Sequence, residues 1–189
     1  MQRGRRQGRQ RHGVCRVVLM NPSVNTVMTI IIASLALLTA CSKCDDTIAT
    51  ITVKGDSLSG IIEEGTAVNV QRNLACAAID RNDIILYNYA GKSDPLIKIV
   101  KAIPGDTWRL DGCSIVVNDI VLSTRNPDGT IGAPYCVGDT RRLQLYANDY
   151  PIIPPDTYLI MGNNPDGTLD SSIFGLVDRE DIIGKVEKG

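Results

Sequence analysis

The segment LIKIVKAI, residues 96–103, is aliphatic except for Lys98 and Lys101. Such a run, rich in β-branched residues, is typical of a β-strand. Similar short runs lie on either side of it, separated at intervals of about 8–15 residues by clusters of Gly, Asn, Asp and Pro, which is the pattern of an all-β domain. We therefore predict a mainly β body whose strands cover residues 48–53, 67–70, 84–89, 96–103 and 114–121.

The body carries little helix signal and clear turn signals. Outside residues 26–42, no window shows a long apolar repeat of period 3.6, so we expect few helices. The tetrapeptide Asn-Pro-Asp-Gly occurs at 126–129 and at 164–167 and predicts two turns in which Gly supplies the positive φ. Their flanking residues differ, so we interpret them as repeated turn chemistry and not as an internal repeat. A chain of 189 residues that is 43% hydrophobic can form one compact domain with an appendage.

The charge is unevenly distributed along the chain. Residues 1–19 contain six arginines and no acid, which leaves 14 basic side chains against 21 acidic ones in the remainder. An acidic body argues against nucleic acid as a partner, because binding to phosphates needs the opposite charge. The single histidine, His12, lies in the basic arm. We therefore expect neither a His-dependent triad nor a His-rich zinc site in the body.

The N-terminal region resembles a membrane-targeting sequence. Residues 1–25 form a basic arm, and residues 26–42 (TVMTIIIASLALLTACS) are uncharged and mostly apolar. A run of 17 residues falls between the apolar core of a secretory signal and a spanning helix. Residues 38–41 (LTAC) also resemble a lipobox, in which Cys41 would be lipidated after cleavage. Both interpretations keep the arginines in the cytoplasm and hold the body, residues 43–189, outside the cytoplasm at the membrane. Met20 and Met28 are alternative first residues of the protein.

Two cysteines of the body leave alternatives open. Cys113 and Cys136 flank a 22-residue polar segment and either form a disulfide in an oxidising compartment or remain unpaired thiols. Cys41 and Cys44 form a C-x-x-C pair, but no second pair follows at the spacing of a zinc site.

Without a histidine in the body, a hydrolase needs another base for its nucleophile. A lysine can serve a serine only when its amine is neutral, which requires burial among apolar side chains. Lys98 and Lys101 lie in an aliphatic run, and residues 55–60 (GDSLSG) place Ser57 and Ser59 in a glycine-rich turn. The structural alternative is a lysine at a sheet edge that reaches water and a serine that caps a turn.

The order and spacing of several segments resemble bacterial signal peptidase I, peptidase family S26. The serine box of that family is similar to residues 55–65, its R-G-D-I-V segment to 81–85, and its lysine box to 97–106. Its C-terminal box is similar to 161–177, and its closing I-x-G-K to 183–185. The resemblance covers the whole body and implies a signal-peptidase-like antiparallel β catalytic domain that follows one N-terminal membrane segment.

The resemblance also implies roles for four residues. Ser57 would be the nucleophile and Lys98 its general base, because the family spacing from Ser57 to Gly65 and from Lys98 to Pro104 is kept. Thr168 would help to orient the lysine, and Asp170 would have a supporting role. The mechanism needs no cofactor and no metal.

The chain departs from the family pattern at several positions. Gly60 and Ile61 stand where the family has proline and threonine, and Asn163 stands in place of the aspartate of G-D-N. Two arginines that typically pair with the equivalent of Asp170 are replaced by Ile99 and Ser172. Because both arginines have changed together, we expect neutral contacts in place of a buried ion cluster. The role of Asp170 is therefore the open point of the motif.

The resemblance implies a membrane-bound serine endopeptidase that removes N-terminal signal peptides from exported preproteins. Its partners would be these preproteins and membrane lipid, and the catalytic domain would lie on the outer (periplasmic) side of the cytoplasmic membrane. One alternative is a LexA-like self-cleaving protease, whose core also pairs a serine turn with a strand lysine; the hydrophobic segment and the C-terminal box argue against it. Another alternative is a catalytically inactive, membrane-tethered lipoprotein of the same fold.

Overall fold

The computed structural model describes residues 47–72, 74, 77–90 and 92–187. The predicted basic arm (1–25) and membrane segment (26–42) lie outside these residues. Within the described part of the chain, no helix is both long enough and apolar enough to cross a membrane.

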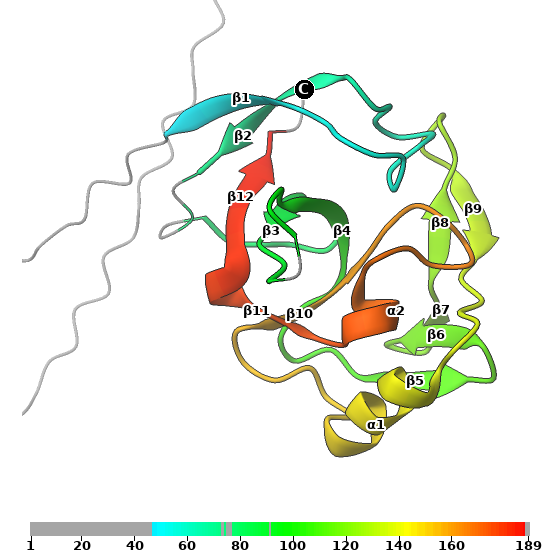
Figure 1. Ribbon diagram of the computed structural model, residues 1–189. Coiled ribbons are helices and arrows are strands. Elements are labelled where there is room, and N and C mark those ends of the chain that lie inside the picture. The colour runs from blue at the N-terminus through cyan, green and yellow to red at the C-terminus, as the bar shows by residue number, and fades with distance from the viewer. Residues whose placement is uncertain (1–46, 73, 75–76, 91, 188–189) are drawn as a thin grey trace, which may run out of the picture. The chain divides into compact units, whose positions relative to one another are not determined.

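The described residues form strands joined mainly by turns, with two short α-helices and one 3-10 helix (Figure 1). The strands are β1 (Ile48–Thr52), β2 (Ala67–Gln71), β3 (Ile84–Tyr87), β4 (Leu96–Ala102), β5 (Trp108–Asp111), β6 (Ser114–Val117), β7 (Ile120–Val121), β8 (Ser123–Arg125), β9 (Ile131–Pro134), β10 (Thr157–Met161), β11 (Val177–Asp178) and β12 (Ile182–Val186). The helices are α1 (Arg141–Asp149), α2 (Ser171–Phe174) and the 3-10 helix η1 (Arg179–Asp181). The mainly β architecture predicted from the sequence is confirmed.

One antiparallel sheet contains the aliphatic run around Lys98 and Lys101, which forms β4. Its strand order is β1-β2-β12-β3-β4-β10-β11, so β4 lies between β3 and β10. In this register Lys98 is opposite Ile85, and Ile99 is opposite Ile84 on one side and Met161 on the other. Six of the seven residues of β4 are buried. Aliphatic residues dominate because both faces of this strand are covered, and the two lysines are buried with them.

Four of the five predicted strands agree with the structure to within two residues, and the fifth prediction was wrong. Residues 114–121 form a hairpin, β6 and β7, and not one strand. Asn118 and Asp119 both have positive φ, 48° and 62°, and occupy the two central positions of the turn. Asn and Asp tolerate this left-handed conformation better than other non-glycine residues, so the chain reverses there. The β5-β6-β7 and β8-β9 sheets are separate from the large one.

The two Asn-Pro-Asp-Gly segments form the predicted turns. Gly129 and Gly167 have φ of 83° and 87°, and each donates its backbone N–H to the carbonyl of the asparagine three residues earlier. Cys113 and Cys136 form a disulfide with an Sγ–Sγ distance of 2.11 Å, which decides between the two alternatives that the sequence left open. The backbone N–H of Cys136 also donates to Pro165 O at 2.8 Å and so joins this region to the second turn.

Candidate active site

The turn that carries Ser57 follows β1 and is closed by backbone hydrogen bonds. Val53 donates to Thr66 O and accepts from the N–H of Gly65, both at 2.9 Å, so the ends of the loop lie together. Within the loop, Leu58 is fully buried in an apolar cluster with Val53 and Ile97. The buried Leu58 anchors the turn, and the neighbouring Ser57 is left half-buried.

Ser57 contacts the strand that carries Lys98. Its hydroxyl Oγ donates to the carbonyl of Ile97, the residue before Lys98, at 3.3 Å. A serine 40 positions away in sequence therefore lies beside β4 at the predicted site. The structure contains no hydrogen bond between Ser57 Oγ and Lys98 Nζ; the contact runs through the backbone of the neighbouring residue.

Lys98 is buried, with 2% of its surface exposed. Burial lowers the pKa of its ammonium group to about 8, against the opposing effects of the negative charges of Asp170 and Asp56. Within the described residues, Lys98 Nζ has no ion-pair partner and no hydrogen-bond acceptor. A substantial fraction of this lysine is therefore neutral near pH 8, and none of the described residues holds its amine.

The loop after β10 carries Thr168 and Asp170, and the carboxylate of Asp170 is its centre. Asp170 is fully buried and accepts five hydrogen bonds. They come from Gly162 N (2.8 Å), Thr168 N (3.1 Å), Thr168 Oγ1 (2.6 Å), Ser172 N (2.9 Å) and Ser172 Oγ (2.6 Å). All five donors are neutral, and the carboxylate also caps the N-terminus of α2.

These contacts explain the loss of the two arginines of the family pattern. Ser172 bonds directly to Asp170, and Ile99 is 3% exposed within an apolar cluster. The expected replacement of an ion cluster by neutral contacts is what the structure contains. Neutral donors satisfy the hydrogen-bonding needs of Asp170 but leave its charge uncompensated, and this charge acts on Lys98.

The Asp170 loop also lies against the serine turn. A Cβ atom placed on Gly162 would lie 2.5 Å from Thr168 Oγ1 and 2.8 Å from Ser57 O. Only glycine fits at a position where two such oxygens approach the backbone so closely. Beyond it, the backbone N–H of Asn163 donates to Ser57 O at 2.6 Å.

The side chain of Asn163 connects two more segments of the site. Its Nδ2 donates to Ser59 O and to Arg125 O, both at 2.9 Å, and its Oδ1 accepts from Arg125 N at 2.8 Å. A carboxylate could not make the two donated bonds, and its charge would face two carbonyl oxygens. In the sequence Asn163 is only a departure from the family pattern, whereas in the structure it ties the serine turn to β8.

A second departure, at Gly60, also has a structural reason. Gly60 has φ of 83°, a value that the ring of proline cannot adopt. Its N–H donates to Glu63 Oε1 at 2.8 Å, and the N–H of Gly55 donates to Glu64 Oε1 at 3.0 Å. Together with Asn163, these bonds hold the turn in a form that has no need of the family's proline.

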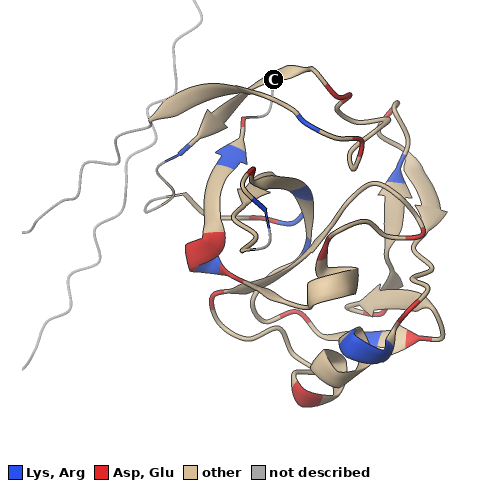
Figure 2. Ribbon diagram, in the orientation of Figure 1, with Lys and Arg blue, Asp and Glu red and all other residues tan. Residues whose placement is uncertain are grey.

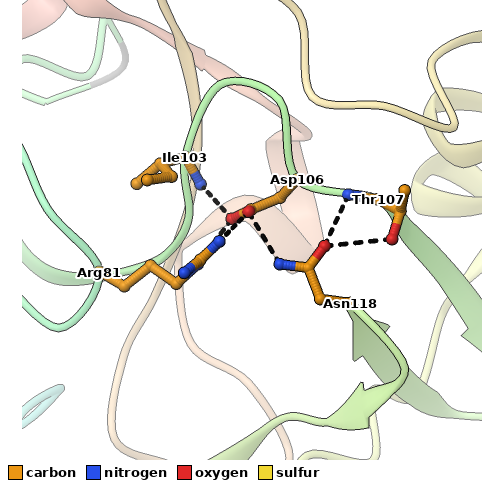
Figure 3. Close-up of polar contacts among 5 residues, drawn as sticks. All are labelled: Arg81, Ile103, Asp106, Thr107 and Asn118. Carbon is orange, nitrogen blue, oxygen red and sulfur yellow. Dashed lines mark hydrogen bonds and ion pairs between the residues drawn. The ribbon is translucent and has the colours of Figure 1, made fainter.

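The arginine and aspartate of two other predicted boxes meet in one polar cluster (Figure 3). Arg81 donates through Nε to Asp106 Oδ2 at 2.8 Å and forms an ion pair through its terminal nitrogen. Asp106 also accepts from Ile103 N and Asn118 Nδ2, each at 2.9 Å. The Arg81 guanidinium and these hydrogen bonds hold the pKa of Asp106 below its usual value, against the opposing effect of burial. This cluster fastens the turn after β4 and contacts neither Ser57 nor Lys98.

An apolar groove of about 230 Å³ runs beside the serine turn. Its apolar lining residues are Ile51, Val53, Leu86, Pro95 and Ile97, and its charged ones are Lys54, Arg72 and Asp94. Lys54 and Asp94 form an exposed ion pair of 3.1 Å between the segment before Ser57 and the segment before Lys98. Ile97 lines this groove, and its carbonyl accepts the hydrogen bond from Ser57 Oγ.

The part of the chain that the structure describes contains no group of three or more His, Cys, Asp or Glu side chains placed to bind a metal ion.

The comparisons with known proteins identify the family. The family model described as "Signal peptidase, peptidase S26" matches residues 23–188. A signal peptidase IB of Staphylococcus aureus is 27% identical over 144 residues, which cover 71% of this chain and 73% of that protein. A probable signal peptidase I-2 of Synechocystis sp. is 27% identical over 114 residues, 56% of this chain and 45% of that protein. A crystal structure of a signal peptidase I from Enterococcus faecalis V583 aligns with a TM-score of 0.44 at 22% identity, covering 58% of this chain and 97% of that chain.

Because the family model matches most of its length, the chain belongs to the signal peptidase family, peptidase S26. Membership in this family supports a peptidase that cleaves signal peptides.

Proposed function

We propose that the chain is a membrane-bound serine endopeptidase that cleaves N-terminal signal peptides from exported preproteins through a Ser57–Lys98 dyad. The observation that carries the proposal is the burial of Lys98 with no partner for its amine, beside the strand carbonyl to which the Ser57 hydroxyl bonds. A lysine with a pKa of about 8 supplies a useful fraction of neutral amine at the pH of the cell exterior.

In the proposed mechanism, neutral Lys98 accepts the hydroxyl proton of Ser57 as Oγ attacks the carbonyl carbon of the scissile peptide. The C–N bond then breaks, and the Lys98 ammonium returns the proton to the leaving amine. Water attacks the resulting ester, with the neutral amine again acting as base, and Ser57 is regenerated. The hydroxyl oxygen of Thr168 can accept a hydrogen bond from the lysine while its proton is donated to Asp170.

The oxyanion of each tetrahedral intermediate requires a hydrogen-bond donor. Within the described residues, no acceptor takes the backbone N–H of Ser57. This N–H is therefore available for the oxyanion. A well-placed donor of this kind contributes about 3–4 kcal/mol to the stabilisation of the transition state. Gly55 carries no hydroxyl that could add a second donor, so we propose that the oxyanion hole relies on backbone groups.

The substrate would bind in the apolar groove. Residues that precede the cut in a secretory signal are small and follow an apolar segment. A groove of about 230 Å³ lined by Ile51, Val53, Leu86 and Ile97 suits small apolar side chains of an extended chain beside a strand edge.

The membrane location of the enzyme is also part of the proposal. Residues 26–42 would either span the cytoplasmic membrane or be cleaved so that Cys41 carries a lipid, and the body would lie on the outer side. Metabolic labelling with a lipid precursor distinguishes the two forms. Label that is lost in Cys41→Ser indicates the lipid anchor, and a chain without label indicates the spanning segment.

The catalytic proposal is tested with Ser57→Ala and its neighbour Ser59→Ala on a preprotein and on a peptide that spans its cleavage site. We expect Ser57→Ala to lose at least a thousandfold in kcat/KM, because the nucleophile is removed. Ser59 is exposed and should tolerate alanine with little change. The proposal is wrong if Ser57→Ala cleaves as well as the wild type.

A further inference from the structure

A second groove, on the side of β8, differs from the apolar groove in its charged lining residues. It has a volume of about 320 Å³, and its basic lining residues are Arg81, Lys101 and Arg125. No acidic residue lines it. We call this the basic groove. Figure 2 shows the basic positions of β4 and β8 on the ribbon.

Two of the three cations in the basic groove lack a compensating carboxylate. The charge of Arg81 is balanced by Asp106 (Figure 3). Lys101 donates to the carbonyl of Ser123 at 2.8 Å, and within the described residues neither it nor Arg125 forms an ion pair. Burial, and then the positive charge of Arg125, lower the pKa of Lys101 to about 8. The two cations therefore repel each other, and an anion in the groove would relieve this repulsion.

The basic groove is joined to the serine turn through Asn163. The same side chain that holds Ser59 O also holds both backbone groups of Arg125. The backbone of Asn163 bonds to Ser57 O at 2.6 Å. The backbones of Arg125 and Ser57 therefore both bond to Asn163.

The rim of the groove is apolar and exposed. Ile120, Val121 and Ile131 are 69%, 46% and 83% exposed, respectively. A polypeptide that carries an acidic side chain could place its backbone and apolar groups along this rim and its carboxylate near Arg125 and Lys101.

We infer that the basic groove binds the segment of the substrate that follows the cleaved bond, and that it favours acidic side chains in that segment. The inference rests on the proposed function. Apolar and small residues before the cut match the apolar groove, which is lined by Ile97, the residue whose carbonyl binds Ser57 Oγ. The polar start of the mature protein is then left for the basic groove, which is joined to the serine turn through Asn163. A carboxylate there gains two uncompensated cations at a partly desolvated site.

The test uses two peptides with the same residues before the cut, and either Glu or Gln at the second to sixth positions after it. Partly exposed charge pairs contribute about 0.2–1 kcal/mol, so wild type should cleave the Glu peptide about 1.4- to fivefold faster in kcat/KM. Arg125→Gln should remove this preference, and Arg125→Glu should transfer it to a Lys peptide. Arg142→Gln, on the exposed surface of α1, is the matched control and should keep the ratio. High salt should reduce the ratio.

Two further measurements keep this inference separate from the proposed function. Binding of the product peptides alone, the Glu and Gln segments after the cut, is measured with Ser57→Ala. If the wild type cleaves neither substrate, the proposed function fails, and tighter binding of the Glu segment still supports the groove. Equal cleavage and equal binding of both peptides overturn the groove and leave the proposed function intact. Binding to phosphatidylglycerol vesicles that is lost in Arg125→Gln, without any peptide preference, would assign the groove to lipid and overturn the inference.

Discussion

Lys98 and Lys101 occupy the same strand, β4, and both are almost completely buried, at 2% and 7% exposure. Burial is the main reason that the pKa of each falls to about 8. On burial and pKa alone, the two lysines cannot be told apart.

Their surroundings differ in a way that separates the two roles. Lys101 donates to Ser123 O at 2.8 Å, and its Nζ lies 5.2 Å from the ring centre of Tyr135, so its amine has partners. The amine of Lys98 has none within the described residues, and the carbonyl beside it binds the hydroxyl of Ser57. Charge differs as well, since Asp170 and Asp56 act on Lys98 and Arg125 acts on Lys101. A lowered pKa makes a lysine available as a base, but only its neighbours give it a proton to take.

The largest expected effect is a difference in activity between variants of the two lysines. Lys98→Ala should reduce kcat/KM by about a hundredfold to ten-thousandfold, the range expected for a general base. Lys101→Met removes the amine but keeps an unbranched side chain only one atom shorter, and it should change kcat/KM by less than about tenfold. Circular dichroism checks that both variants are folded. Similar losses in both would mean that β4 is needed as a whole and that Lys98 has no separate role.

The second prediction concerns stability, where the two lysines should behave alike. The folded-state pKa of each is about 8 against 10.5 for the free side chain, so the unfolded chain binds more protons between these values. Stability supplied by each lysine therefore rises as the pH is raised from about 8 to about 10. The free energy of unfolding of Lys98→Met minus that of the wild type should therefore be larger at pH 7 than at pH 10, by about 2 kcal/mol.

Urea unfolding at pH 7 and pH 10 measures this difference for Lys98→Met and for Lys101→Met. A difference that does not change with pH in either variant would show that the two amines are not desolvated.

The third and smallest effect tests the tie that Asn163 makes between the serine turn and β8. Asn163→Asp restores the residue of the family motif but removes two donated hydrogen bonds and directs a carboxylate at the carbonyls of Ser59 and Arg125. We expect a loss of about tenfold, mainly in kcat, because the turn that carries Ser57 loosens. Asn164→Asp is the matched control, since Asn164 uses only its Oδ1, as an acceptor for Asp166 N.

The pH midpoint of the remaining activity of Asn163→Asp should move upward, because the added carboxylate acts on Lys98 in the same direction as the charges of Asp170 and Asp56. A variant as active as wild type would show that Asn163 does not position the serine.

The sequence predicted the elements whose signals are local. Strands near residues 48–53, 67–70, 84–89 and 96–103 are β-branched runs bounded by turn residues, and the structure contains them. The prediction of one strand over 114–121 missed the hairpin at 118–119, although Asn118 and Asp119 are a pair of turn residues between two apolar runs. Helix α1 was missed because only Leu143 and Ala147 are buried in it, which is too short a repeat to show a period of 3.6.

The residues of the candidate site also fall into those that the sequence predicts and those that only the structure reveals. The spacing of Ser57, Lys98, Thr168 and Asp170 could be read from ordered boxes, and the roles of these four residues stay predictions. The tie made by Asn163 could not be read, because its partners are backbone groups 38 and 104 residues away. Arg125 had no motif at all, and only the fold joins its backbone to the serine turn, through Asn163.

The pH profile of kcat/KM, measured in parallel on wild type and Lys101→Met, tests the claim that neutral Lys98 is the base for Ser57. Only the neutral amine accepts a proton, so activity should rise with pH and level off above a midpoint near 8. Lys101→Met should keep that midpoint. A rise that begins only near pH 10.5, or one that disappears in Lys101→Met, would contradict the assignment of Lys98.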